Sequence, residues 1–340
     1  MAVVRVPFRA AIVGTGYAGQ RHADALRDLG IDFVGPLSAR EVARQPSPLE
    51  SPTIQVVHVC STNDLHAPLA TAALAAGKHV VCEKPLALDV PAAEDLRARA
   101  EASGCLAVLG YNYRFHPMVI ELGARIAAGE LGTLHDVRGM FLQDWLLLPT
   151  DDNWRVDAAR GGASRVVADI GAHWLDLAES LTGRAVEAVI AQLGRLHDRG
   201  TEDHAGMLVR FSGGLTGTCV LSQASAGHHN DMEISFDGSI GSATWRYERP
   251  DELWIGQQGR SGVVKRDGAL ASPEARDLAK WAAGPNEARR NLIAAAYARL
   301  AGETRRSPAP LPTFADGVRH LRFTAAALAS AQRRAWVEVR

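Results

Sequence analysis

The chain is predicted to be an α/β protein whose N-terminal part forms a doubly wound parallel sheet, followed by a second, strand-rich part. Three observations predict this. A short apolar strand runs into a glycine-rich turn and a helix near the N-terminus, and strands and helices then alternate to about residue 111. Strand-like runs separated by turn residues fill the stretch from Val186 to Gly259. Alternation of strands and helices is typical of a parallel sheet with helices on its faces.

Composition indicates a globular protein of about two domains. The chain has 340 residues, 47% of them apolar and 22% charged, and a formal net charge of −1. This balance gives no electrostatic reason to expect nucleic acid or an anionic membrane as a partner. The four cysteines lie far apart without a CxxC pair, so neither a disulfide framework nor a zinc site is expected. Without a signal-like N-terminus or a long apolar run, we expect a cytoplasmic location.

The first element is an apolar strand, residues 9–13, that leads into a glycine-rich turn and a helix ending near Gly30. In such a turn the first glycine allows the tight bend and the second lets a pyrophosphate approach the backbone. The third lets helix and strand pack closely, and the helix N-terminus favours the phosphate charge. An ordinary glycine-rich turn is the alternative. The expected cofactor contacts here are Gly14, Thr15, Gly16, Tyr17, Ala18 and Gly19.

The second strand, residues 31–37, ends at Ser38, where an acidic residue would bind the ribose diol of NAD. A serine hydroxyl there, with Arg40 two positions on, suits a 2′-phosphate better, which favours NADP over NAD. The alternative is that Arg40 is a solvated residue on a turn. Pro46, Pro48 and Pro52 leave little room for a helix before the next strand, so one edge of the sheet is expected to be reduced.

Three more strands are expected at residues 54–59, 79–82 and 105–111, with helices over residues 67–77 and 90–103. Ligands of parallel sheets bind beyond the carboxyl ends of the strands. Lys84 follows the strand 79–82 at such an end, within Glu83-Lys84-Pro85. We therefore expect Lys84 at the mouth of a cleft, the alternative being a solvated lysine on a surface turn.

These motifs together resemble a known family. The segments GTGYAG, STNDLH, CEKP, GYNYRFHP and RGGASRVVADIGAHWLDL, in this order, resemble the glucose–fructose oxidoreductase / inositol dehydrogenase / rhizopine-catabolism (Gfo/Idh/MocA) family of NAD(P)-dependent oxidoreductases. The resemblance implies a Rossmann domain at residues 1–112. It also implies a domain at residues 113–340 that binds substrate and forms oligomers, with a large, mostly antiparallel sheet whose open face commonly makes a dimer or tetramer. This chain departs from the family in the shortened segment after the second strand and in Ser38.

The resemblance also implies the catalytic residues. Asp169 and His173 lie four apart, so on a helix they share one face. His173 would be the general acid/base, and Asp169 would bind a substrate hydroxyl and bias the imidazole. Lys84 would hydrogen-bond the reacting oxygen. Alternatively, Asp169 and His173 form a capping or packing pair.

Further residues are expected to line the cofactor and substrate sites. Trp145 and Trp154 beside acid and amide residues suit a polyhydroxylated ring, the alternative being that they fill core or interface. No metal site is expected, because no third ligand has convincing spacing. The remaining cofactor contacts are expected to be Ser61, Thr62, Asn63, His66, Glu83, Lys84, Pro85, Asn112 and Arg114. Glu83 is expected to contact the nicotinamide ribose or to orient Lys84.

The function that these expectations favour is hydride transfer between NADP or NAD and a hydroxyl or carbonyl group of a neutral sugar, glycoside or cyclitol. No cluster of basic residues near the expected pocket indicates a sugar phosphate. Two alternatives stay open: a redox glycosidase with tightly held NAD, and a non-catalytic, cofactor-binding regulator. The presence of Lys84, Asp169 and His173 argues against the regulator, because a mere binder has no chemical need for them.

Overall fold

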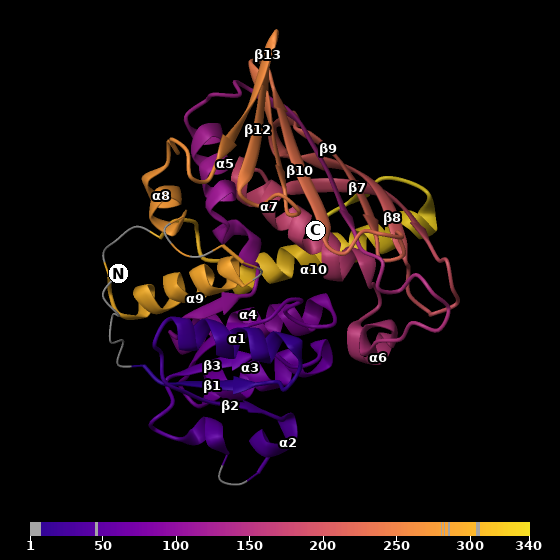
Figure 1. Ribbon diagram of the computed structural model, residues 1–340. Helices are drawn as coiled ribbons and strands as arrows, with labels where there is room; N and C mark the ends of the chain where they lie inside the picture. Colours follow the sequence, from indigo (N-terminus) through magenta and orange to yellow (C-terminus); the bar gives the residue numbers. More distant parts are fainter. Residues whose placement is uncertain (1–7, 45–46, 280, 282, 285, 304–306) are drawn as a thin grey trace. The chain divides into compact units, whose positions relative to one another are not determined.

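The computed structural model describes residues 8–44, 47–279, 281, 283–284, 286–303 and 307–340. The chain divides into two compact units (Figure 1). The first comprises Met1–Phe115 and Gly284–Arg319, and the second His116–Ala283 and His320–Arg340. The sequence places a boundary near residue 112 but gives no sign that a late segment returns to the first unit.

The first unit is built on a five-stranded parallel sheet, which confirms the predicted doubly wound part. Its strands are short and apolar, and the strands at residues 10–13 and 56–59 are completely buried, as expected when helices cover both faces. The strand order is β2 (Phe33–Leu37), β1 (Ala10–Val13), β3 (Val56–Val59), β4 (His79–Cys82) and β5 (Ala107–Leu109).

Helices follow most of these strands. The crossover from β2 to β3 is reduced to two short helical turns, α2 (Ala39–Val42) and the 3₁₀ turn Pro48–Glu50, as the prolines predict. Pro46 lies outside the described residues. The other helices of this unit are α1 (Tyr17–Asp28), α3 (His66–Ala75), α4 (Val90–Ser103) and α9 (Glu287–Leu300), with 3₁₀ turns at Asn63–Leu65 and Asn112–Phe115.

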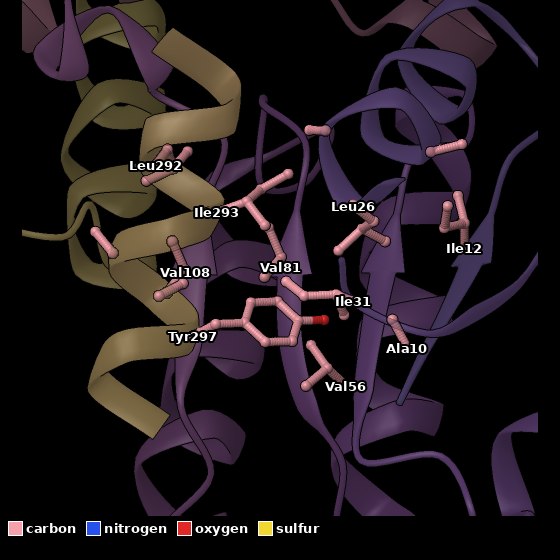
Figure 2. Packing of buried hydrophobic residues seen from close by; sticks show 14 of the residues in the cluster. Ala10, Ile12, Leu26, Ile31, Val56, Val81, Val108, Leu292, Ile293 and Tyr297 are labelled. Atoms are coloured by element: carbon pink, nitrogen blue, oxygen red, sulfur yellow. The ribbon is translucent and has the colours of Figure 1, made fainter. Parts of the chain in front are cut away.

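Helices α1 and α9 pack together over one face of this sheet and close its core. Leu26 of α1 and the α9 side chains Leu292, Ile293 and Tyr297 meet the strand residues below them, as Figure 2 shows. Helix α9 therefore completes a core that α1 covers only in part, although the two helices are far apart in the sequence.

The second unit is built on a nine-stranded, mostly antiparallel sheet, which confirms the predicted fold class. Strands β6 and β9 pair in parallel, and the other neighbours are antiparallel. The order is β13 (Arg260–Lys265), β12 (Glu252–Gln257), β11 (Gly241–Arg246), β10 (Asp231–Gly238), β6 (Leu134–Leu142), β9 (Thr216–Ser222), β8 (His204–Phe211), β7 (Val186–Gly194) and β14 (Val337–Glu338).

One face of this sheet carries the unit's core. Along β8, buried and exposed residues alternate strictly, as expected of a strand with one solvated face. Trp174 of α7 (Ala172–Thr182) lies on the buried face, where a side-chain carbon at Gly139 would come within 2.2 Å of the indole nitrogen. The remaining helices are α5 (Pro117–Ala127), α6 (Ala158–Gly161), α8 (Pro273–Ala279) and α10 (Phe314–Arg333), the first residues of which belong to the first unit.

Helix α7 is preceded by a π-helical turn, Val167–Gly171, whose start is held by buried acids. The Glu202 carboxylate accepts hydrogen bonds from the Arg165 and Val167 backbone nitrogens at 2.9 and 3.2 Å. Next to it, the Arg165 guanidinium pairs with Asp203. Both members of this pair are buried, Arg165 at 2% exposure and Asp203 at 0%. These contacts fix where the helical segment begins.

We expect Asp203→Asn to lower the free energy of unfolding by about 3–5 kcal/mol, because it leaves the buried Arg165 cation without its counter-ion. Chemical denaturation measures this. Asp95→Asn is the matched control, because Asp95 pairs with Arg99 on an exposed helix face and such pairs contribute little. Equal stability of the two variants would show that the Arg165–Asp203 pair does not hold this segment.

None of the helices in the described part of the chain combines the length and apolar character needed to cross a membrane.

Candidate active site

The glycine turn after β1 has the geometry that the sequence predicts. Gly14 has a φ of +130° and lies so close to β3 that an added side-chain carbon would be 2.2 Å from the Cys60 carbonyl oxygen. At Gly19 the same carbon would be 1.8 Å from the Gly14 oxygen, so helix and turn touch there. At Gly16 it would meet nothing within 4 Å. Two glycines are thus required by the fold, and the middle one borders open space.

The N-terminus of α1 borders the same space. Gly16 is the N-cap residue and supplies no side-chain acceptor to the first backbone N–H groups of the helix. Thr15 and Tyr17 are exposed beside it. Free N–H groups and the positive end of a helix dipole suit a phosphate group, so the turn fits the pyrophosphate of a dinucleotide.

The end of β2 carries both a cation and an anion. Ser38 caps α2, and its hydroxyl and backbone N–H both donate to the Glu41 carboxylate at 2.7 Å. These hydrogen bonds lower the pKa of Glu41. Arg40 is exposed. Glu41 lies three residues beyond Ser38 in the sequence, and the capping box brings its carboxylate back to the end of the strand.

The residues after β3 form a short, partly buried corner. Asn63 is 8% exposed, and Ser61 and Thr62 are half-buried. The His66 ring is buried, with Nδ1 2.7 Å from the Pro85 carbonyl oxygen and Nε2 3.1 Å from the Ser61 carbonyl oxygen. It therefore ties the loop after β3 to the loop after β4.

The Glu83-Lys84-Pro85 turn follows β4 without a break in the ladder, because the Glu83 N–H donates to the Val59 carbonyl at 2.8 Å. Lys84 is half-buried, and the Lys84–Pro85 peptide bond is cis. Lys84 thus lies at the carboxyl end of a central strand, and not on a solvated surface turn.

Asn112 and Arg114 follow β5 and are buried at 8% and 6% exposure. The Arg114 guanidinium lies 3.3 Å from Asp316. Burial would raise the pKa of Asp316, but Arg114 and the donors at Thr313 outweigh it and lower that pKa to about 2. Arg114 therefore has a structural partner, and a cofactor contact is an additional role that stays a prediction.

In the second unit, Asp169 and His173 stand out by exposure. All the remaining residues from Ser164 to Glu179 are buried, whereas these two are half-buried. Asp169 lies in the π-helical turn and His173 in the first turn of α7, so the pair shares one face of a helix whose regular pattern is interrupted between them. Such π turns occur frequently at functional sites.

The Asp169 carboxylate is held by side chains from other elements. Gln223 is 0% exposed, and its amide nitrogen donates to Asp169 at 2.9 Å and to Gln143 Oε1 at 3.2 Å. Arg155 lies 3.6 Å from the other Asp169 oxygen. Gln143 in turn donates to Asn230 at 2.8 Å. The arrangement combines carboxylate and amide oxygens with amide and guanidinium donors around a half-buried carboxylate, which suits a polar ligand.

The two tryptophans have partners of different kinds. The Trp145 indole donates to Gln143 Oε1 at 2.8 Å, which joins it to the Asp169 network. The Trp154 ring is covered by the Arg155 guanidinium, 4.4 Å from the ring centroid, with Arg160 at 6.0 Å. Trp145 therefore belongs to the polar cluster, whereas one side of Trp154 is already stacked.

Comparison with known proteins agrees with this geometry. Residues 38–111 match the oxidoreductase family with an NAD-binding Rossmann fold, and residues 119–244 match the GFO/IDH/MocA C-terminal domain. The chain belongs to the GFO/IDH/MocA family. It is 28% identical to levoglucosan dehydrogenase of Pseudarthrobacter phenanthrenivorans, over 96% of this chain and 97% of that protein.

Solved structures of GFO/IDH/MocA relatives share the whole fold. An inositol dehydrogenase homolog from Azotobacter vinelandii, complexed with NAD⁺, matches with a TM-score of 0.85 and 28% identity over 98% of both chains. Levoglucosan dehydrogenase in complex with NADH and L-sorbose matches with a TM-score of 0.84 and 25% identity, over 98% of this chain and 99% of that one. The protein is therefore an oxidoreductase of an NAD-binding family.

Several residues around these sites escaped the sequence interpretation. Gln223 and Glu202 lie in the strand-rich half, far from any motif. Arg289 and Tyr297 come from α9, whose return to the first unit the sequence does not indicate. His58 stands in the apolar run at residues 54–60, where a buried histidine needs a partner. His22 lies among the polar residues of α1 and gives no such signal. Among the described residues, no group of three His, Cys, Asp or Glu side chains is placed to hold a metal ion.

The three glycines allow a direct test of the turn. We expect Gly16→Ala to leave the melting temperature unchanged and to weaken dinucleotide binding at least tenfold, because the added methyl group enters only the open space. Gly19→Ala should instead destabilise the fold, because the methyl group overlaps the Gly14 carbonyl. Calorimetry and fluorescence titration measure both quantities. Unchanged cofactor affinity in Gly16→Ala would show that no phosphate approaches this turn.

Proposed function

We propose that the protein is an NAD(P)-dependent dehydrogenase or reductase that acts on a hydroxyl or carbonyl group of a neutral sugar, glycoside or cyclitol. The observation that carries this proposal is that Asp169 and His173 are the two half-buried residues in the otherwise buried run from Ser164 to Glu179. The relatives support it, since their names and bound molecules include NADH, levoglucosan and L-sorbose.

The residues of the first unit would hold the cofactor. We assign the pyrophosphate to the Gly14–Gly19 turn, and the nicotinamide side to Glu83, Lys84 and the corner after β3. The nicotinamide, when bound, accepts or gives up a hydride. We also propose contacts from the remaining strand-end residues Ser61, Thr62, Asn63, His66, Pro85, Asn112 and Arg114.

The chemistry needs a proton acceptor beside the carbinol. We propose that His173 takes the hydroxyl proton as the carbinol C–H bond breaks and its electron pair leaves as hydride. Asp169 would accept a hydrogen bond from a substrate hydroxyl and bias the His173 ring. Lys84 would donate to the reacting oxygen and stabilise its negative charge. In this scheme Lys84, Asp169 and His173 act on one substrate, as the family resemblance implies.

We propose that substrate recognition depends on hydroxyl donors. Asp169 and the amide oxygens around it are acceptors, and the Arg155 charge next to Asp169 is balanced by that carboxylate. A neutral polyol satisfies such a site, whereas a sugar phosphate would bring further negative charge. Trp145 would contact the apolar face of the ring, and Trp154 would do so on the side that Arg155 does not cover.

We also propose that the chain forms a homodimer or homotetramer in the cytoplasm. The large sheet exposes three large apolar side chains, Leu208, Trp254 and Val263, which are 51%, 41% and 49% exposed. Strand pairing places Trp254 next to Val263 and separates this pair from Leu208 by the polar residues Thr218, Arg138, Ser235 and Thr244. Exposed apolar side chains of this size support an interface. Three of the four free cysteines are buried, which fits a reducing compartment.

We expect His173→Ala to lower kcat by roughly 10²–10⁴-fold, the usual effect of positioned acid–base catalysis. Cofactor affinity should be unchanged, since the glycine turn belongs to the first unit. Steady-state kinetics and fluorescence titration measure the two, with the exposed His135→Ala as the control. A His173→Ala enzyme with normal kcat would remove the acid–base assignment.

Lys84→Ala should reduce kcat by a comparable factor, which corresponds to a loss of transition-state stabilisation on the order of 3 kcal/mol. The double variant Lys84→Ala/His173→Ala should lose less than the sum of the two free energies, because both side chains act on one oxygen. The same kinetics test this, with the exposed Lys265→Ala as the control. Fully additive losses would indicate that the two residues act independently.

Cofactor preference is a separate expectation. Ser38 and Arg40 favour NADP(H), whereas the Glu41 carboxylate beside Ser38 opposes a 2′-phosphate. If Arg40 binds that phosphate, Arg40→Ala should weaken NADP(H) binding and leave NAD(H) binding unchanged, with Arg44→Ala as the control in the same segment. Calorimetric titration decides. Tighter binding of NAD(H) by the unmodified chain would refute the preference for NADP(H).

A further inference from the structure

Five polar side chains of the first unit meet inside the core that α1 and α9 cover. Their positions follow from strand and helix periodicity. His58 lies two residues after Val56, and Glu83 two after Val81, so both point to the face on which these valines pack. His22 precedes Leu26 by one helical turn, and Tyr297 follows Ile293 by one turn. Figure 2 shows Tyr297 reaching from α9 among the strand residues.

The five side chains form a continuous hydrogen-bonded chain. Tyr297 Oη lies 3.1 Å from His58 Nε2, and His58 Nδ1 lies 2.8 Å from His22 Nδ1. His22 Nε2 lies 3.1 Å from Glu83 Oε1. Arg289 reaches the same carboxylate oxygen with Nε at 3.3 Å and Nη2 at 3.2 Å. Both histidines and the tyrosine are buried, at no more than 1% exposure.

Only one arrangement of protons satisfies every contact while both imidazoles are neutral. A carboxylate accepts only, so His22 must carry its proton on Nε2 and present a lone pair at Nδ1. His58 must then donate from Nδ1 and accept at Nε2. The Tyr297 hydroxyl can only donate to that nitrogen. Every donor in the chain therefore points toward Glu83.

The charges agree with this reading. Burial lowers the pKa of both His22 and His58, which keeps the rings neutral. Burial would raise the pKa of Glu83, but Arg289 and His22 outweigh it and hold that pKa well below its usual range. Burial also raises the pKa of Tyr297. The ionisable groups that face Glu83 are His22 from α1, Cys60 after β3, His66 from α3, Cys82 and Lys84 from β4 and its turn, and Arg289 from α9.

The two oxygens of Glu83 are not equivalent. Oε1 receives three donor groups, whereas no residue in the described part of the chain donates to Oε2. Gly110 makes room for Oε2, since an added side-chain carbon there would lie 3.0 Å from it. Glu83 keeps 10% of its side-chain surface exposed. One oxygen is thus saturated from inside the core, and the other is left as an acceptor.

We propose that His22 and Arg289, with His58 and Tyr297 behind them, are positioning residues that hold Glu83 as a carboxylate with Oε1 occupied and Oε2 offered to a hydroxyl of the bound dinucleotide. The assignment rests on the proposed function, because it needs a dinucleotide at this strand end. His58 and Tyr297 act through His22, since they fix which of its nitrogens carries the proton.

Arg289 gives the sharpest test with the cofactor. In the unmodified chain Glu83 stays ionised, so its affinity for NAD(H) or NADP(H) should change less than about twofold between roughly pH 8 and pH 5.5. Arg289→Gln removes the cation, so burial raises the pKa of Glu83 and the carboxyl is protonated as the pH falls. The affinity of this variant should then fall about tenfold for each unit below the new pKa. Arg289→Lys keeps the charge and should restore the flat profile.

The titration separates this assignment from the proposed function. An unmodified chain that binds neither dinucleotide would overturn both. A chain that binds one of them, but whose Arg289→Gln variant shows a flat pH profile, would overturn the assignment alone, because a merely structural role lowers the melting temperature without adding a titration to the dissociation constant.

A second measurement needs no cofactor and no change at Arg289. Nitrogen-15 NMR of the histidine-labelled full chain reports which ring nitrogen is protonated, with His22→Gln and His58→Gln used to assign the two signals. We expect His22 protonated on Nε2 and His58 on Nδ1, with neither ring titrating between about pH 5.5 and pH 8. In Tyr297→Phe the His58 Nε2 signal should shift toward that of an unbonded nitrogen. The opposite tautomer at His22 would overturn the assignment.

Discussion

The first unit depends on the in-register parallel pairing of β1, β3 and β4. The register joins Val13 to Val59 and Val59 to Cys82, so the three strands end at the same level. The ladder continues for one more residue, because the Cys60 N–H donates to Val13 and the Glu83 N–H to Val59. Gly14, Ser61 and Glu83 are thereby brought to one edge of the sheet, although nothing in their local sequences connects them.

That edge combines two opposite requirements. The backbone at Gly14 and Gly19 is packed too tightly for any side chain, whereas Gly16 borders the open space in which we propose that the dinucleotide binds. Glu83 extends the same logic to charge, because a carboxylate can stay ionised inside a core only when donors surround it. Arg289 and the neutral histidines supply those donors. The core of the first unit thus stabilises a polar group that faces its ligand edge.

In the second unit, amide side chains hold a partly buried carboxylate in place. Asp169 is held by Gln223 from the end of β9 and by Arg155, and Gln143 links Gln223 to Trp145. The start of the helical segment is fixed separately by Glu202 and Asp203. The Asp169 carboxylate therefore lies on a helical segment whose start is fixed by two residues that precede β8, and its amide partner Gln223 directly follows β9.

The sequence predicts the parts of this account that depend on local pattern. The glycine turn, the strand ends and the spacing of Asp169 and His173 are periodicities or short motifs, and the structure has them where they were expected. The Glu41 carboxylate at Ser38 was missed, although a serine followed three residues later by a glutamate is the local signature of a capping box. The π turn at Asp169 and the β6–β9 pairing were not predicted, because each depends on a contact or a backbone register that one sequence does not encode locally. For the same reason, the sequence does not predict that α9 belongs to the first unit, and the contributions of Arg289 and Tyr297 were missed as a result.

Isotope transfer is the most direct test of whether the protein moves a hydride between a polyol and a nicotinamide cofactor. The full chain would be incubated with oxidised NAD or NADP and a panel of carbon-deuterated sugars, glycosides and cyclitols, and the reduced cofactor would be analysed by mass spectrometry. Hydride transfer predicts that at least one member of the panel gives reduced cofactor carrying one deuterium, and that His173→Ala slows its appearance. If the protein binds the dinucleotide but no member of the panel transfers deuterium to it, the proposed hydride transfer is contradicted.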